Sequence, residues 1–123
     1  MLLYAQLAVV ALLWYLDYLG IMKSFFTTVP AWDVPMHTLG GVFLGLFLAW
    51  ILRLRGARVN VVQAALFAFA VGFAWEVFEY AFHIGGNIFM PYWLDTLKDL
   101  LDDTMGGILG GIAATYILKR WRK

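Results

Sequence analysis

The stretch DTLKDLLDDTMGGILGG, residues 95–111, joins a series of acidic residues to a series of glycines. Its second half contains two pairs of small residues four apart, Gly106 with Gly110 and Gly107 with Gly111. Such pairs let helix backbones approach closely inside a lipid bilayer, where no hydrophobic driving force holds helices together. The stretch therefore predicts a helix that packs closely against a neighbour and carries acidic side chains beyond the contact.

The composition of the whole chain is that of a membrane protein. Of its 123 residues, 63% are hydrophobic and only 14% are charged, and the mean hydropathy is +0.80. These values are too apolar for a soluble domain of this length. The net charge of +1 gives no reason to expect nucleic-acid binding, and the absence of cysteine excludes disulfides and thiolate metal ligands.

Four stretches are apolar enough to be membrane spans, each needing about 20 helical residues to cross a hydrocarbon core of about 30 Å. The sequence therefore predicts an all-α fold, a four-transmembrane-helix bundle forming a single membrane domain over residues 1–123. The predicted spans are 2–22, 34–53, 60–83 and 94–118. The last span must begin near residue 94, because the uncharged part that follows Asp103 is too short to cross. A short interfacial helix followed by a kink is the alternative for this segment.

Basic and acidic residues separate along the predicted spans. Basic residues fill the loop between the second and third spans and follow the fourth; they are Arg53, Arg55, Arg58, Lys119, Arg120, Arg122 and Lys123. The positive-inside rule places these residues, and with them both termini, in the cytoplasm. All eight acidic residues and both histidines then lie toward the outer face.

Helical spacing brings these polar residues together. Residues three, four or seven apart lie on the same side of a helix. The polar residues of the predicted spans have this spacing, and all lie near the outer end of the predicted bundle. The residues are Asp17 on the first span, Asp33 and His37 on the second, Glu76, Glu79, Tyr80 and His83 on the third, and Asp95, Asp99 and Asp102 on the fourth, with Asp103 turned partly aside.

Glycines predict which spans touch. Gly41 and Gly45 on the second span form a pair like those of the fourth, just below the acidic residues. Contact between the two spans would hold His37 near Asp99, Asp102 or Asp103. Glycines left over on the span surfaces make a homodimer plausible.

Three motifs also carry a family resemblance. They are Asp33-Val-Pro-Met-His37 with Gly40-Gly41, then Trp75-Glu76-Val-Phe-Glu79-Tyr80, then Asp95-Thr-Leu-Lys-Asp99 ahead of Asp103 and Gly106-Gly107. In this order they resemble the VanZ-like and YjdF-like families of small integral membrane proteins. The resemblance implies a fold, a polar site and the prokaryotic plasma membrane, with a role in the cell envelope or in glycopeptide antibiotic resistance. It implies no particular reaction.

The crowding of acids at the edge of the hydrocarbon predicts a bound divalent cation. Crowded carboxylates there must be protonated, paired with internal basic groups or bound to a cation, and on that side only Lys23, Lys98 and the two imidazoles are available as basic partners. Carboxylate and imidazole ligands suit magnesium, manganese, zinc or iron. The predicted ligands are His37, Glu76, Glu79, Asp99 and Asp103, with Asp33, His83, Asp95 and Asp102 as further candidates.

Several functions fit such a site. The first is a metal-dependent hydrolase or transferase acting on a lipid-linked or phosphate-bearing substrate, with Glu76, Glu79, His37 and Tyr80 as catalytic candidates and Tyr80 or His83 as proton donor. The second is a non-catalytic membrane module that binds a cation or a lipid, or supports a partner. An ion or proton pathway is less favoured, because Gln6 and Gln63 are the main polar residues of the inner halves.

Four of these residues also have local explanations. Asp17 can hydrogen-bond locally, Asp33 can cap the second span, and His83 can be an interfacial residue at a helix end. Asp95 can serve as a favourable negative charge near a helix N-terminus.

Overall fold

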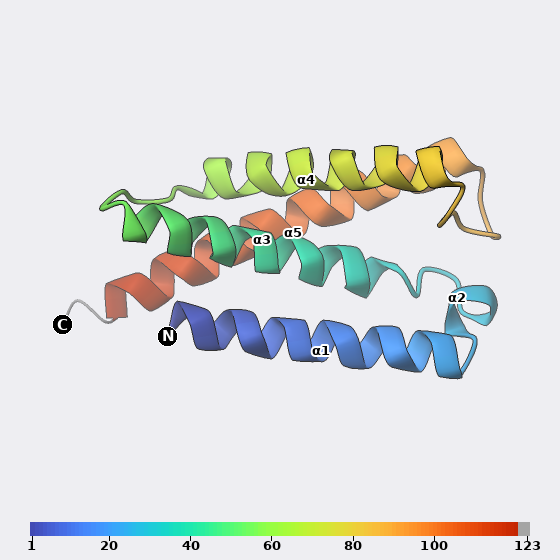
Figure 1. Ribbon diagram of the computed structural model, residues 1–123, viewed down its shortest axis with the longest axis horizontal. Helices are drawn as coiled ribbons and strands as arrows, with labels where there is room; N and C mark the ends of the chain where they lie inside the picture. The colour runs from blue at the N-terminus through green and yellow to red at the C-terminus, as the bar shows by residue number, and fades with distance from the viewer. Residues whose placement is uncertain (121–123) are drawn as a thin grey trace.

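The protein consists of four long helices and one short one. The computed structural model describes residues 1–120. The helices are α1 (Leu2–Met22), α2 (Phe25–Thr28), α3 (Val34–Leu54), α4 (Val61–Phe82) and α5 (Tyr92–Arg120). The long helices run alternately up and down, so the start of α1, the α3–α4 loop and the end of α5 lie at one end of the molecule (Figure 1). The all-α prediction is confirmed, and α5 is continuous rather than kinked.

Three of the helices are long and apolar enough to cross a membrane. These are α1, α3 and α4, and their bounds agree with the predicted spans within one residue at each end. The last helix, α5, has 29 residues and does not meet the same criterion. Its first part carries five charged residues between Asp95 and Asp103, which lower its hydropathy.

Local sequence signals explain where two of the helices begin. At α4 the Asn60 side chain accepts a hydrogen bond from the Gln63 amide at 2.8 Å, and the Asn60 amide donates to the Gln63 side chain at 3.0 Å. At α3, Pro35 occupies the first turn, where its missing N–H is not needed. Asp33 is the residue before α3, but its side chain makes no capping hydrogen bond, so the predicted capping role is wrong. Its carboxylate bonds to Lys98 instead.

The short helix α2 was not predicted. It follows Ser24, whose backbone φ of 56° ends the first helix with a sharp change of direction. The hydroxyls of Thr27 and Thr28 both donate to the Ser24 carbonyl, at 3.0 and 2.9 Å. Local side-chain bonds of this kind stabilise single turns that periodicity does not reveal.

Glycines bring α3 and α5 into backbone contact, as the sequence predicted. A Cβ atom added to Gly41 would clash with the carbonyl oxygen of Asp103 and lie 2.9 Å from the Gly106 Cα atom. One added to Gly45 would lie 2.8 Å from the Gly107 carbonyl oxygen. Only residues without a side chain permit this approach, which fixes the register of α3 against α5.

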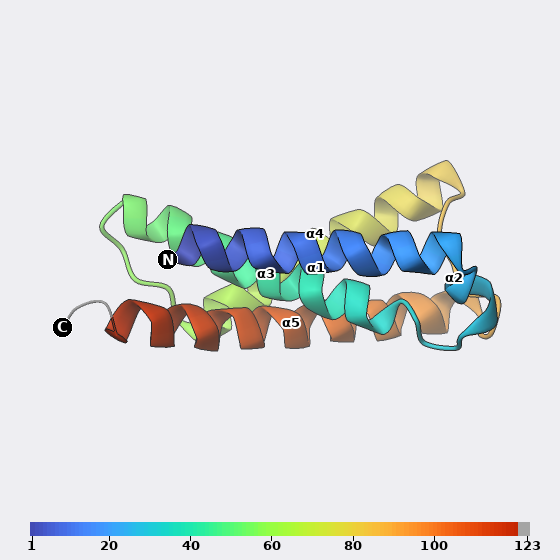
Figure 2. The same cartoon turned by 90° about the horizontal axis from the view of Figure 1, so that it is seen from below.

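The same helix α5 packs against α4 on its other side. A Cβ atom on Gly107 would lie 2.6 Å from the Ala68 Cβ atom, and one on Gly111 would lie 2.9 Å from that of Ala64. Helix α1 packs against α3. Toward its C-terminal end α4 diverges from α5, which Figure 2 shows clearly.

The charges separate as predicted. Arg53, Arg55 and Arg58 lie at or beyond the end of α3, at the same end of the molecule as Lys119 and Arg120. Arg122 and Lys123, which belong to the same predicted basic group, lie outside the described residues. The acidic residues of α4 and α5 lie toward the opposite end.

Candidate metal centre between three helices

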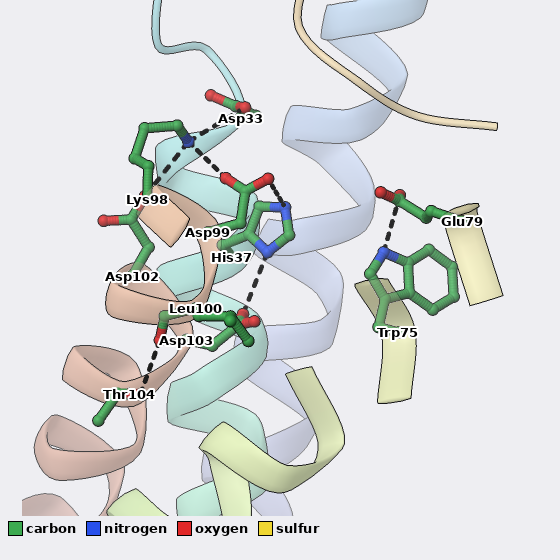
Figure 3. A network of polar contacts seen from close by, with 10 residues as sticks. All are labelled: Asp33, His37, Trp75, Glu79, Lys98, Asp99, Leu100, Asp102, Asp103 and Thr104. Carbon is green, nitrogen blue, oxygen red and sulfur yellow. Dashed lines mark hydrogen bonds and ion pairs between the residues drawn. The ribbon is translucent and has the colours of Figure 1, made fainter. Parts of the chain in front are cut away.

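His37 lies between two aspartates of α5. Its Nδ1 atom is 3.1 Å from Asp103 Oδ1, and its Nε2 atom is 3.4 Å from Asp99 Oδ2 (Figure 3). The two aspartates are one helical turn apart, so they flank the imidazole from below and above. This confirms the predicted approach of His37 to Asp99 and Asp103; Asp102 contacts Lys98 instead.

The glycine contact explains why these aspartates meet this histidine. Gly41, one turn after His37, touches the backbone of Asp103 itself. On the opposite side, Gly72 of α4 leaves a notch for the Asp103 side chain, and a Cβ atom there would lie 2.9 Å from its Cγ atom. Asp103 is therefore held between α3 and α4, with its Oδ1 atom directed to the imidazole.

Glu76 completes a three-helix group. It lies one turn beyond Gly72 on α4 and is only 5% exposed. Its Oε1 atom is buried and has no hydrogen-bond partner among residues 1–120. His37, Glu76 and Asp99 each offer a ligand atom, and these three atoms all lie within 4.8 Å of one another. Such a group of one imidazole and two carboxylates can hold a divalent cation.

Burial makes this group costly unless a proton or a cation neutralises its charge. Asp95, Asp99 and Asp103 are 4%, 3% and 6% exposed. A buried carboxylate without a partner is strongly unfavourable, because it loses the hydration that stabilises its charge. The sequence predicted acids at one depth, and the structure shows that the helices also hide them from solvent.

One lysine compensates part of this charge. The Lys98 ammonium is 3.2 Å from Asp33 Oδ2 and 3.5 Å from Asp102 Oδ2, and it also bonds to Asp99 Oδ1 (Figure 3). Asp99 therefore directs one oxygen to the lysine and the other to His37. No lysine or arginine in the described part of the chain forms an ion pair with Glu76, Asp95 or Asp103.

Glu79 belongs to a different contact. Its Oε1 atom accepts a hydrogen bond of 2.8 Å from Trp75 Nε1 (Figure 3). A Cβ atom on Gly85 would lie 2.8 Å from the same oxygen, and the φ of Gly85 is +75°, which favours glycine. The structure does not bring Glu79 within ligand distance of His37 and Asp99, although the sequence grouped it with Glu76.

Tyr80 and His83 do not join the site. Tyr80 is 69% exposed, and its ring lies 6.1 Å from that of Tyr92. His83 is exposed and ends α4 with a φ of 53°. The prediction that Tyr80 and His83 share a polar side with Glu76 and Glu79 at the site is therefore wrong, because α4 diverges from the bundle beyond Glu79 (Figure 2).

His37, Asp99 and Asp103 line a cavity of about 540 Å³, whereas Glu76 is not among its lining residues. Its walls combine acids from three long helices and the α2–α3 segment, including Asp17, Asp33, Glu79 and Asp99, with many apolar side chains. The apolar part of the lining comprises Leu13, Phe26, Val29, Met36, Leu44 and Val71, together with Trp32 and Trp75. Such a lining suits a molecule that has a polar group and a hydrocarbon part.

A family model describes almost the whole chain. Residues 2–120 match the family described as predicted membrane protein (DUF2238). The chain belongs to this family. Membership agrees with the three apolar helices and makes the protein a membrane protein. No curated protein and no solved structure matched the chain, and the finer resemblance to VanZ-like and YjdF-like proteins stays a prediction.

Sequence reasoning named Asp33 and Asp95 only as further candidate ligands and did not predict that they form a second group with Asp99. Asp33, Asp95 and Asp99 offer oxygen atoms that all lie within 4.8 Å of one another. The spacing of Asp95 and Asp99, one turn apart on α5, was the available signal. It was outweighed by the local explanations given to Asp33 and Asp95.

Proposed function

We propose that the protein is a four-span membrane protein that binds a divalent cation through His37, Glu76 and Asp99. The fourth span is α5, which is amphipathic in its first part and packs its polar side against α3 and α4. The acidic end faces outward from a prokaryotic plasma membrane, since the arginines and lysines collect at the other end. The bound cation faces the cavity between α1 and α4.

The observation that carries this proposal is the meeting of three buried ligand atoms from three helices. Their spacing within 4.8 Å matches a cation at the centre of the group, and the Glu76 Oε1 atom has no hydrogen-bond partner in residues 1–120 that would compete for it. Asp103 supports the group by accepting a hydrogen bond from His37 Nδ1, which leaves Nε2 as the ligand atom. A histidine ligand held by a carboxylate in this way is common in metal sites.

The cavity supports a substrate with a phosphate and a lipid part. Its acids alone would repel an anionic headgroup, whereas a bound cation would attract phosphate oxygens. The apolar walls would accept the first part of a hydrocarbon chain. A cation held by His37, Glu76 and Asp99 would supply Lewis-acid chemistry for a hydrolysis, in which water would lose a proton and add to phosphorus while the bond from phosphorus to the lipid oxygen would break and that oxygen would take up a proton. Glu79 lines the same cavity and is the candidate to exchange these protons.

Metal analysis of purified protein tests the cation site. Protein extracted in mild detergent should contain a stoichiometric divalent metal, or take up manganese after treatment with a chelator. Glu76→Gln and His37→Ala should each lose it while keeping their helical content and elution volume. Asp17→Asn is the matched control, because Asp17 lines the cavity without belonging to either ligand group. A wild type without metal, and indifferent to chelator, would contradict the proposal.

A second measurement separates catalysis from binding. A panel of lipid-linked phosphates is incubated with metal-loaded protein, and released phosphate or headgroup is measured. Release that Glu76→Gln abolishes would support a hydrolase or transferase. Metal binding without release from any substrate would favour the non-catalytic module that sequesters a lipid. The proton-pathway alternative stays open: Gln63 is used in the cap of α4, whereas Gln6 is buried and its Nε2 atom has no hydrogen-bond partner in residues 1–120.

A further inference from the structure

The cavity beside the candidate cation site changes from acidic to apolar along the bundle axis. On α3 its lining begins at Asp33 and His37 and continues through Gly40 to Leu44. These residues extend over about 16 Å, at a rise of about 1.5 Å per helical residue. The walls on α1 and α4 change in the same direction, with Asp17 and Glu79 as the acids and Leu13 and Val71 as the apolar residues.

The deep end of the cavity, lined by Leu13, Leu44 and Val71, lies halfway along three helices. Each of these residues is at or next to the midpoint of its helix, α1, α3 or α4. All three helices are long and apolar enough to cross a membrane. Halfway across a bilayer the surroundings are hydrocarbon. The deep end of the cavity therefore lies at the depth of the lipid chains.

The helices leave one side of this deep end open. Its lining comes from α1, α3 and α4, and α3 lies between the other two and packs against both (Figure 1). Within residues 1–120, α1 and α4 do not form a packed pair. On α4, Val71 and Trp75 line the cavity although they are 37% and 49% exposed. The cavity therefore opens sideways between α1 and α4, toward the bilayer.

Gly40 joins the polar part of the cavity to the deep end. It lies about one turn from His37 and one turn from Leu44, and it lines the cavity. A Cβ atom built there meets no heavy atom of residues 1–120 within 4 Å, apart from its own helix and chain neighbours. Gly41, by contrast, is needed for the backbone contact with α5. The missing side chain of Gly40 thus leaves room on the cavity side of α3.

We infer that a lipid chain enters from the bilayer between α1 and α4 and lies across Gly40, with its end near Leu44. The chain belongs to a lipid whose phosphate reaches the cation at His37 and Asp99. This inference rests on the proposed function and adds the route and position of the lipid part. The volume of about 540 Å³ is that of a ligand pocket. Hydrocarbon suits the deep end better than a water-soluble ligand, because the lining there is apolar.

A photoreactive alkyl phosphate tests this route. The probe is dodecyl phosphate with a diazirine at the end of its chain, added with manganese to the full chain in phosphatidylcholine vesicles. After illumination, mass spectrometry should place the label at or beside Leu13, Leu44 and Val71. The corresponding photoreactive alcohol, which lacks the phosphate, should label these positions less. Equal labelling by the alcohol would overturn the role given to the phosphate.

Filling the cavity should remove the label. Gly40→Phe should reduce labelling of the deep end by about tenfold or more, because burial of two methylene groups is worth about that factor. Manganese binding should remain, since Gly40 is not a ligand. Ala70→Phe is the control, because Ala70 lies beside Val71 but is exposed and does not line the cavity, and it should keep the label. If Gly40→Phe does not fold, Val71→Trp on the α4 wall should give the same loss.

The outcomes distinguish this inference from the proposal on which it rests. A label found only outside the cavity, or a deep label unaffected by Gly40→Phe, would overturn the chain route. Manganese binding without deep labelling would also overturn the route and leave the cation site intact. Deep labelling of a protein that binds no manganese would overturn the cation site and support the route.

Discussion

The α3–α5 contact has a glycine half and a polar half, which are built in opposite ways from the same two helices. In the glycine half the backbones touch, and in the polar half an imidazole and two carboxylates lie between the helices. Asp103 belongs to both halves, since its carbonyl meets Gly41 and its side chain meets His37. The comparison shows that a rigid apolar contact sets the geometry of a polar site beside it.

The largest effect is expected from breaking the glycine contact. Gly41→Val would place side-chain atoms against the Asp103 carbonyl and the Gly106 Cα atom, neither of which can move without shifting a helix. We expect a loss of about 1–3 kcal/mol or more in the free energy of unfolding, and loss of cation binding with it. Unfolding of the detergent-solubilised protein by added denaturing detergent measures the first effect.

Gly40→Ala is the matched control for this substitution. No heavy atom of residues 1–120 lies within 4 Å of a Cβ atom at Gly40, apart from its own helix and chain neighbours. The variant should be at least as stable as the wild type, because alanine favours a helix over glycine. Equal damage from both variants would mean that α3 and α5 do not meet at Gly41.

The second effect concerns the polar half alone. Asp103→Asn keeps the size of the side chain but removes the charge that holds His37 Nδ1. We expect cation affinity to fall by about 10–100-fold, the usual cost of losing such a supporting carboxylate. Titration with manganese measures this affinity. An unchanged affinity would show that Asp103 does not orient the histidine.

A smaller effect is expected where the two halves join. Gly72→Ala would press against the Asp103 carboxylate without touching a cation ligand. The displaced carboxylate should weaken cation binding by up to about tenfold, with little change in helical content by circular dichroism. Affinity reduced in Asp103→Asn but not in Gly72→Ala would mean that the Asp103 side chain adjusts freely.

The smallest effect on cation binding is expected at Glu79. Its carboxylate bonds to Trp75 and lies outside both ligand groups. Glu79→Gln should leave manganese affinity within about twofold of the wild type, whereas Glu76→Gln should abolish binding. Glu76 and Glu79 are only three residues apart. The two isosteric variants therefore test whether the divergence of α4 keeps Glu79 out of the cation site. A large loss of affinity in Glu79→Gln would contradict the observed arrangement.

The sequence predicted more of the helices than of the polar contacts. Long apolar runs and glycine pairs indicated the helices and the α3–α5 contact, because both depend on patterns within one segment. The exclusion of Tyr80 and His83 depends on the divergence of α4, which no spacing within α4 encodes. Likewise Asp33 has the position of a capping residue, but its carboxylate bonds to Lys98. That partner lies 65 positions later in the chain, so no local pattern predicts the contact.

Spectroscopy of the metal ligand tests the central claim most directly. Protein with ¹⁵N-labelled histidine is loaded with manganese, and the coupling of nitrogen to the metal is measured in the wild type, His83→Gln and His37→Gln. The account predicts a nitrogen coupling in the wild type and in His83→Gln that disappears in His37→Gln. Bound manganese without any histidine coupling, or a coupling that persists in His37→Gln, would contradict it.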